Sequence, residues 1–356
     1  MSNLDLMQLI KDKVKSLKAY QVENVDCAIK LHANENSFPP PPEILKLFED
    51  VFKATELNRY PDPDCRPLKQ TLSKRLGVAP ENLAIGNGSD ELIQILLQVF
   101  CDPEDTVGFP DPTFAMYAII AQGMGLKSQI HPLDDQWDFK AEPFLETLET
   151  SGVRIAFLSY PNNPPGNCFS ASEVQKVIEN FSGIVVVDEA YHDFARKTFL
   201  SELPRHNNLV ILRSLSKIGL AALRVGYAVA DPVIIDQIDK IRLPYNSNSL
   251  SQNMTDRLLN HFAPVQQQID KLLMERDRMI DALSKFRQLT VYPSDANFVL
   301  FRVEQDSAAL FKRLMDQDIL IRDLDSHPRL KNCLRVTIGT PEENQAFLEQ
   351  MAQIIK

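Results

Sequence analysis

Residues 184–191 read Ile-Val-Val-Val-Asp-Glu-Ala-Tyr, so that a run of four β-branched apolar residues leads directly into two carboxylates. A short run of this kind is typical of a strand inside a mostly parallel sheet. A carboxylate at the end of such a strand, here Asp188, is costly to bury unless it has a cationic partner. The stretch therefore predicts a buried strand that ends in a polar site.

The alternation around this strand predicts the fold class. From residue 82 to residue 230, short apolar runs alternate with segments of helical periodicity, which is typical of an α/β domain. We expect a mostly parallel seven-stranded sheet, flanked by helices. The expected strands are Leu83–Ile85, Thr106–Phe109, Ser128–His131, Arg154–Ser159, Ile184–Val187, Leu209–Leu212 and Val225–Ala230, and the expected helices are Asp90–Phe100, Thr113–Gln122, Phe139–Thr150 and Ala171–Phe181.

The pattern changes on both sides of this region. After Asp231, long helices and a few short strands predict a second, smaller α+β domain. The N-terminal stretch has little periodicity and ends in four prolines, which indicates an arm. We expect an N-terminal arm at residues 1–40, a large α/β domain at residues 41–245 and a small α+β domain at residues 246–356.

Composition and charge exclude several classes of protein. The 356 residues include 38 Lys and Arg against 48 Asp and Glu, a net charge of −10, which argues against a nucleic-acid binder. No apolar run reaches the roughly 18 residues of a membrane span, and the first thirty residues lack a secretory signal. The five cysteines are far apart, which fits reduced thiols and no metal site. We expect a soluble, cytoplasmic protein.

A lysine lies in a loop of small residues after the strand expected at Leu209–Leu212. The loop reads Ser214-Leu215-Ser216-Lys217-Ile218-Gly219, and Arg224 follows seven residues after the lysine. A lysine at a strand end can form a Schiff base, and the nearby hydroxyls and arginine suit a bound phosphate. Alone, Lys217 is equally explained as a solvated loop lysine.

A glycine-rich turn opens the first helix of the large domain. The turn reads Gly86-Asn87-Gly88-Ser89-Asp90 and follows an expected strand. Backbone N–H groups at a helix start, together with the helix dipole, form a cradle for a phosphate. An ordinary helix cap at Ser89 or Asp90 explains the same residues.

Three further strand ends carry side chains that suit a flat aromatic ligand. Asp188 could pair with a pyridinium nitrogen, and Tyr191 could reach a phenolic oxygen on the same ring, or the two belong to an internal Asp–Arg pair and the core. The turn at residues 161–166 presents Asn163, and Phe114 could stack on a ring, although turns and core aromatics are common. Ligands of open parallel sheets bind at the carboxyl ends of the strands. Together the segments describe a site for pyridoxal 5'-phosphate.

With these motifs the chain resembles a known family, the class I and II aminotransferases among the fold type I pyridoxal-phosphate enzymes. The resemblance covers almost the whole chain. The lysine loop and the Asp188-x-x-Tyr191 spacing are specific for the superfamily. The runs Asn58-Arg59-Tyr60-Pro61-Asp62 and Pro244-Tyr245-Asn246 point to the branch of the family that acts on histidinol phosphate.

The resemblance implies a role for each cofactor-binding residue. Lys217 carries the cofactor and serves as general base and acid, Asp188 pairs with the ring nitrogen, and Phe114 lies over the ring. Asn163 and Tyr191 bind the ring hydroxyl. The implied phosphate ligands are Gly88, Ser89, Asp90, Ser214, Ser216 and Arg224, with Tyr60 reaching in from a second copy of the chain, so that a homodimer is implied.

The resemblance also implies a substrate site. Arg335 matches the arginine that binds the substrate α-carboxylate, and Arg322 is a second cation for a phosphate. For Arg322 the alternative is a surface ion pair with Asp323 or Asp325. The implied substrate residues are Tyr20, Asn34, Asn163, Arg322 and Arg335.

The expected reaction is transamination between L-histidinol phosphate and 2-oxoglutarate, a step of L-histidine biosynthesis. Its products are 3-(imidazol-4-yl)-2-oxopropyl phosphate and L-glutamate. Two alternatives stay open at this point, an aromatic amino-acid aminotransferase and a threonine-phosphate decarboxylase. No metal, nucleic acid or membrane is expected as a partner.

Overall fold

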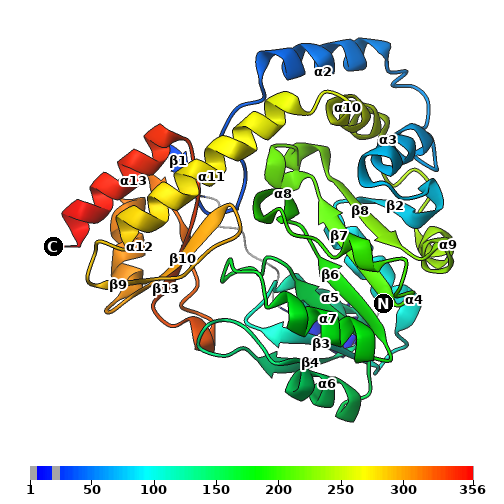
Figure 1. Cartoon of the computed structure of the whole chain (residues 1–356), viewed down its shortest axis with the longest axis horizontal. Coiled ribbons are helices and arrows are strands. Elements are labelled where there is room, and N and C mark those ends of the chain that lie inside the picture. The colour runs from blue at the N-terminus through cyan, green and yellow to red at the C-terminus, as the bar shows by residue number, and fades with distance from the viewer. Residues whose placement is uncertain (1–5, 18–24, 356) are drawn as a thin grey trace, which may run out of the picture.

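The computed structural model describes residues 6–17 and 25–355 and is built around a seven-stranded sheet (Figure 1). The strand order is β2-β8-β7-β6-β5-β3-β4. Strand β8 is antiparallel to both of its neighbours, and the other pairs are parallel. This confirms the predicted α/β class and the mostly parallel sheet. The strands are β2 (Leu83–Asn87), β3 (Thr106–Asp111), β4 (Lys127–Pro132), β5 (Val153–Ser159), β6 (Ile184–Asp188), β7 (Leu209–Ser214) and β8 (Val225–Ala230).

Helices cover both faces of this sheet, which is why the central strands are apolar throughout. In β6, Val186 packs in one hydrophobic cluster, and Val185 and Val187 pack in another on the opposite face. All three side chains are fully buried. The first face is covered by α4 (Ser89–Phe100), α5 (Met116–Met124) and α9 (Pro232–Ile241), and the second by α6 (Ala141–Thr150) and α7 (Ala171–Asn180).

A four-stranded antiparallel sheet lies beside the large one, at the left of Figure 1. Its strand order is β12-β13-β10-β9, and three helices pack around it. The elements are β9 (Leu289–Val291), β10 (Phe298–Val303), β12 (Arg322–Asp323), β13 (Cys333–Thr337), α11 (Ala263–Leu283), α12 (Ser307–Met315) and α13 (Pro341–Ile354).

The chain from residue 29 to residue 34 is tied to this second sheet. Strand β1 (Ile29–Lys30) pairs in parallel with β11 (Ile319–Leu320). Leu31 is fully buried, and its backbone bonds to Leu320 and Thr337 at 2.7 and 2.9 Å. This part of the expected arm therefore contributes to the core. The division into three parts at residues 40 and 245 stays a prediction.

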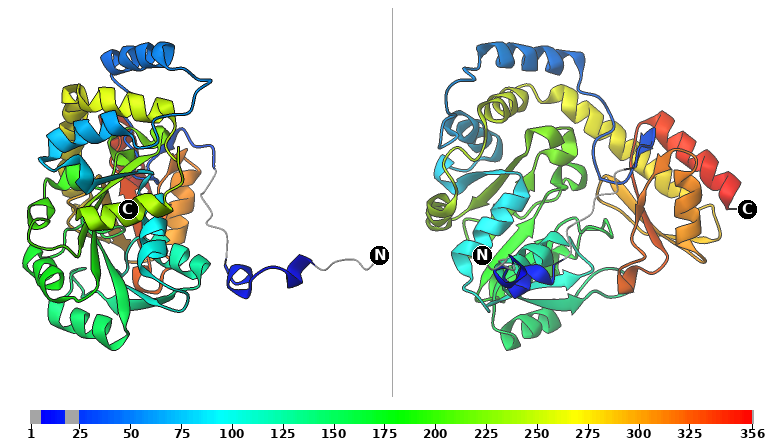
Figure 2. Two further views of the ribbon diagram at one scale, coloured as in Figure 1. Left: turned by 90° about the vertical axis from the view of Figure 1, so that its right-hand side faces the viewer. Right: turned by 180° about the vertical axis from the view of Figure 1, so that it is seen from behind.

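Two helices lie between the arm and the sheet where the sequence analysis assigned none. Helix α2 (Pro42–Ala54) lies at the top of Figure 1 and packs on α10 (Ser249–Leu259), and α3 (Arg66–Leu76) packs on α10 as well. Helix α1 (Asp12–Lys15) lies against α5, with Lys13 Nζ donating to the carbonyl oxygen of Met124, and η1 (Leu6–Gln8) projects from the body of the molecule in Figure 2. The remaining elements are η2 (Pro80–Asn82), α8 (His192–Ala195), η3 (Leu200–Glu202), η4 (Ser216–Ile218), η5 (Ala221–Leu223) and η6 (Pro328–Leu330).

One boundary affects the site. The helix expected at Thr113–Gln122 begins at Met116, so Phe114 lies in the loop that follows β3.

Within residues 6–17 and 25–355, no helix is long and apolar enough to cross a membrane. The same residues contain no group of three His, Cys, Asp or Glu side chains arranged to hold a metal ion.

Candidate active site

The strands bring the predicted residues to one edge of the large sheet. Strands β5, β6 and β7 are parallel and end there, and β2 runs in the same direction because it is antiparallel to β8. Strand β8 runs the opposite way, so Arg224, directly before it, arrives at the same edge. A cavity of about 380 Å³ opens at this edge. Its lining includes Asn34, Ser89, Asp90, Phe114, Asn163, Asp188, Tyr191, Ser214, Ser216, Lys217, Arg224, Arg322 and Arg335.

The Asp188 carboxylate is buried at the end of β6. Tyr117 donates a hydrogen bond to its Oδ2 at 2.7 Å, and the N–H of Ala190 donates to its Oδ1 at 3.1 Å. Burial raises the pKa of Asp188 to about 6, against the lowering effect of these two bonds. The acid–arginine pair of the alternative explanation forms at the next residue instead, between Glu189 and Arg213 at 2.8 Å.

Lys217 lies in the cavity rather than on an open surface. It belongs to the short η4 turn after β7 and is half-buried. Its Nζ lies 3.5 Å from the carbonyl oxygen of Ala33 and 5.8 Å from the centroid of the Tyr191 ring. It forms no ion pair with any residue that the structure describes. This geometry favours a chemical role over the solvated loop lysine.

The residues of the predicted phosphate cradle meet around Arg224. Its Nη1 donates to Ser216 Oγ at 3.3 Å, and its Nη2 lies 3.6 Å from Asp90 Oδ2. Ser214 Oγ donates to Ser216 Oγ at 3.0 Å. Gly88 has φ of 84°, and a Cβ there would lie 2.6 Å from Arg224 Nη2. Glycine therefore gives the arginine room to lie over the turn.

The start of α4 is open toward the cavity. Gly88 precedes the helix, and no side chain caps it. Its first N–H groups consequently have no partner within the helix, which is the condition for binding an anion there. The ordinary side-chain cap at Ser89 or Asp90 is not formed.

A hydrogen-bond network fixes Tyr191 and Asn34. Asn34 Nδ2 donates to Tyr191 Oη at 2.9 Å, so the tyrosine hydroxyl keeps its own proton available for another acceptor. Asn34 adopts a left-handed backbone conformation with φ of 56°. Its N–H donates to Thr337 Oγ1 at 3.0 Å, and Asn297 Nδ2 donates to its carbonyl oxygen at 3.0 Å.

Two arginines face each other across β12 and β13. Arg322 and Arg335 are direct partners in the antiparallel register, and both line the cavity. Arg335 donates through Nη1 to Asn163 Oδ1 and through Nη2 to the carbonyl oxygen of His32 at 2.8 Å. Like charges directly opposite in a sheet repel each other. The pair therefore favours an anion between them.

The surface ion pair considered for Arg322 is not formed in the described part of the chain. Asp325 accepts instead from the N–H of Asn332 at 2.7 Å and lies 3.4 Å from Lys331 Nζ. Arg322 has no ion pair with a described residue. Its side chain is available to the cavity.

Among the predicted side chains that the structure describes, Tyr60 does not line the cavity of this chain. Tyr60 is 81% exposed and stacks on Tyr245, with ring centroids 4.6 Å apart. Tyr20 lies outside the described residues.

Comparison with known proteins identifies the family. A sequence model of the aminotransferases of class I and II matches residues 27–351. The chain belongs to this family. The family and the fold predicted from the sequence are thereby confirmed.

Similar aminotransferases cover nearly the whole chain. The histidinol-phosphate aminotransferase of Caldanaerobacter subterraneus is 36% identical over 98% of this chain and 99% of its own length. Histidinol-phosphate aminotransferase 2 of Nitrosococcus oceani is 39% identical over 97% and 96%. The crystal structure of the histidinol-phosphate aminotransferase from Sinorhizobium meliloti in complex with pyridoxal-5'-phosphate is similar in fold, with a TM-score of 0.88 at 24% identity over 99% and 98% of the two chains.

Tyr117 of this aminotransferase contacts the predicted site directly, although it was not among the predicted residues. Tyr117 is fully buried, bonds to Asp188, stacks on Phe157 at 4.7 Å and meets Phe114 edge to face at 5.5 Å. It follows Phe114 by three residues, the spacing of one helical turn, and that was the signal available in the sequence.

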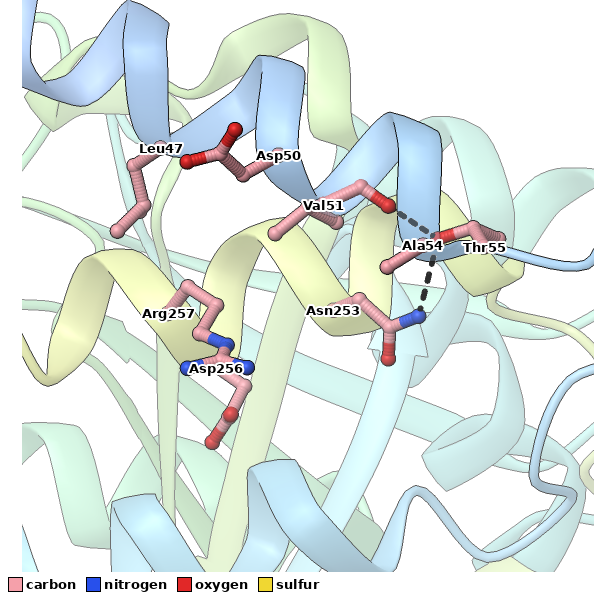
Figure 3. A pocket seen from close by; sticks show the side chains of 8 residues that line it. All are labelled: Leu47, Asp50, Val51, Ala54, Thr55, Asn253, Asp256 and Arg257. Atoms are coloured by element: carbon pink, nitrogen blue, oxygen red, sulfur yellow. Dashed lines mark hydrogen bonds between the residues drawn. The ribbon is translucent and has the colours of Figure 1, made fainter.

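A second hollow of this aminotransferase lies between α2 and α10, with a volume of about 600 Å³ (Figure 3). It is crossed by a hydrogen bond of 3.4 Å from Asn253 Nδ2 to Thr55 Oγ1. None of the predicted site residues lines it. Its lining is Leu47, Asp50, Val51, Ala54, Thr55, Asn253, Asp256 and Arg257.

The burial of Asp188 predicts a pH-dependent stability difference in the cofactor-free protein. Because its folded-state pKa of about 6 lies above the ordinary 3.8, the stability that it contributes is present at low pH and is lost as pH rises through about 6. Asp188→Asn cannot ionise. We expect the free energy of unfolding of the variant to exceed that of the wild type. This excess should be about 1.5 kcal/mol larger at about pH 8 than at about pH 5.

Urea unfolding of the two cofactor-free proteins at both pH values measures this difference. Glu173→Gln is the matched control, because hydrogen bonds from Ala141 and Lys176 lower the pKa of Glu173, so that its stability contribution is lost at low pH instead. A stability difference for Asp188→Asn that is the same at both pH values would contradict the prediction.

Proposed function

We propose that the chain transfers an amino group between L-histidinol phosphate and 2-oxoglutarate, with pyridoxal 5'-phosphate as its cofactor, as a step of L-histidine biosynthesis. The observation that carries this proposal is the pair Arg322 and Arg335, which faces the cavity of Lys217 and Asp188. The pair adds an anion site to the separate cradle around Arg224. The names of the relatives support the same substrate.

The residues present fit the cofactor. Asp188 is a buried carboxylate whose hydrogen bonds come from a neutral phenol and an amide, which suits a pyridinium nitrogen as the missing cation. Gly88, Ser89, Asp90, Ser214, Ser216 and Arg224 would hold the phosphate. Tyr191 and Asn163 would bind the ring hydroxyl, and Phe114 would lie against the ring. When bound, this cofactor accepts the electron pair released at the substrate Cα.

Lys217 is the residue that we assign to proton transfer. Its Nζ is held near the carbonyl oxygen of Ala33 and has no carboxylate partner in the described chain. An amine in this position can take a proton from the Cα of the amino donor in one half-reaction and return a proton to the Cα of the product amine in the other. Asp188 would keep the ring nitrogen of the bound cofactor protonated, because its carboxylate pairs with no other cation in the described chain.

The two arginines explain how one site serves two substrates. Arg335 is fixed by Asn163 and the His32 carbonyl group, and suits the carboxylate of glutamate as a bidentate partner. Histidinol phosphate has no carboxylate but carries a phosphate dianion. Arg322 supplies the second cation that a dianion needs. Asn34, which holds Tyr191, and Tyr20 complete the proposed substrate residues.

The substrate assignment predicts a difference between two amines. L-Histidinol phosphate should convert the cofactor absorbance of the purified enzyme at a concentration at least about tenfold lower than L-phenylalanine, because only the phosphate engages both arginines. A spectral titration in parallel measures both. Conversion by phenylalanine alone would move the function to aromatic amino acids, and release of CO₂ without consumption of 2-oxoglutarate would indicate a decarboxylase.

The proton-transfer assignment predicts the behaviour of Lys217→Ala. The variant should lose turnover by at least about a thousandfold, because it loses the general base and the amine that carries the cofactor. It should still bind the cofactor reversibly through the cradle around Arg224, as measured by equilibrium dialysis. Lys331→Ala, at a surface lysine paired with Asp325, is the control. Full turnover in Lys217→Ala would end the assignment.

We also propose that the chain works as a homodimer in the cytoplasm. Tyr60 is highly exposed and lies outside the cavity, although it belongs to the run that resembles the phosphate-binding tyrosine of a neighbouring subunit. On and after α2, Leu45, Phe52 and Leu57 are 48%, 52% and 64% exposed. Such an apolar surface favours a second copy of the chain.

A shared site predicts complementation between two inactive variants. Lys217→Ala and Tyr60→Ala each damage every site of their own dimers. Mixed dimers have one site in which both residues are intact, so random mixing should recover activity in about a quarter of all sites. Turnover after mixing and refolding measures this recovery. No recovery, in the presence of mixed dimers shown by mass, would place Tyr60 outside the partner's site.

A further inference from the structure

His32 lies at the anion end of the cavity, and its ring has no part in the roles assigned above. It follows the fully buried Leu31, whose backbone bonds to Leu320 and Thr337 fix the chain at this point. Its carbonyl oxygen accepts a hydrogen bond from Arg335 Nη2 at 2.8 Å. The backbone of His32 is therefore held in place by one of the substrate arginines.

The His32 ring lines the same cavity as Arg322 and Arg335. Its Nδ1 is buried and has no hydrogen-bond partner among the residues that the structure describes. Nε2 is not among the buried atoms without a partner, and no hydrogen bond to a described residue is formed there. In this ring Nδ1 is therefore buried in the protein, and Nε2 is available to bind a ligand.

The charges around His32 keep the ring neutral in the free site. Burial lowers the pKa of His32 most, and Arg322, Arg335 and Lys30 lower it further. Glu35 raises it and is the acid that opposes them. A neutral ring that carries its proton on Nδ1 keeps the lone pair of Nε2 available, so that Nε2 can take a proton from solvent and donate it in a hydrogen bond to an anion. A bound dianion would cancel the charge of the two arginines and place negative charge beside the ring, which favours a second proton on Nε2.

We propose that His32 is a specificity residue, which donates a hydrogen bond to the substrate phosphate and takes up a proton when that dianion binds between Arg322 and Arg335. A carboxylate carries half of this charge and is matched by Arg335 alone. His32 therefore selects for the phosphate-bearing substrate over the carboxylate-bearing one. The inference rests on the proposed function, because it concerns the substrate end of the same site.

Two unreactive ligands test this directly. 2-(Imidazol-4-yl)ethyl phosphate and 3-(imidazol-4-yl)propanoate share a ring and differ in the anion, and neither has the amine needed for reaction. Calorimetry on the cofactor-loaded enzyme near neutral pH, in two buffers of different ionisation enthalpy, gives the affinity and the protons taken up. The ionisable groups of each ligand contribute the same proton uptake in every variant. A difference in proton uptake between variants therefore comes from the protein.

Two substitutions separate the hydrogen bond from the proton. His32→Gln keeps a donor but cannot gain a charge, so it should bind the phosphate ester within about threefold of the wild type and take up about one proton less per site. His32→Phe keeps the ring shape and loses both nitrogens. It should bind the ester about tenfold more weakly, as for a lost hydrogen bond to a charged group, and the propanoate unchanged.

The control is His131→Gln. His131 is also half-buried with a pKa lowered by burial, but its Nδ1 bonds to Thr147 at 3.1 Å and it does not line the cavity. It should match the wild type for both ligands. Equal weakening of both ligands in His32→Phe, or unchanged proton uptake in His32→Gln, would overturn the proposal. Failure of the proposed function is recognised separately, because the wild type would then not convert histidinol phosphate.

Discussion

The constraint on which the site depends is the burial of the Asp188 carboxylate with no cationic partner in the described part of the chain. The central strands are apolar because helices cover both faces of the sheet, and Asp188 ends one of these strands. Tyr117 and Ala190 donate hydrogen bonds to its two oxygens, but neither donor carries a positive charge. An ionised carboxylate in this place costs free energy until a cation arrives. The fold thus holds a site that is complete only with a cationic ring beside it.

The reversal of β8 is the topological feature that assembles the rest. In an entirely parallel sheet, the residue before β8 would lie at the opposite edge from the end of β7. Because β8 is antiparallel, Ser214 and Gly226 are register partners, and Arg224 comes next to Ser216. Gly226 also approaches the turn at Gly88 so closely that a Cβ would lie 2.4 Å from the N–H nitrogen of Ser89. One strand therefore joins the lysine loop to the phosphate cradle.

These two features explain which parts of the site could be predicted from the sequence. Each strand of the large sheet carries its own short signal, so Lys217, Asp188 and Ser89 could be placed at strand ends without a structure. The pairing of Arg322 with Arg335 depends on the register of β12, a strand of two residues without periodicity. Tyr117 and His32 act through contacts across the fold, and neither was given a role from the sequence. Helix α2 was missed although Pro42 at its start is a known signal.

The free site holds opposite imbalances at its two ends. Asp188 is a buried anion that pairs with no cation among the described residues, and Arg322 with Arg335 places two cations side by side. Each imbalance destabilises the empty protein and is removed by the ligand group of matching charge, so part of the electrostatic free energy of binding is stored in the fold. His32 lies beside the cation pair and can change its charge, whereas the arginines cannot. The anion end can therefore adjust to one or two negative charges, which is what a site that alternates between a carboxylate and a phosphate requires.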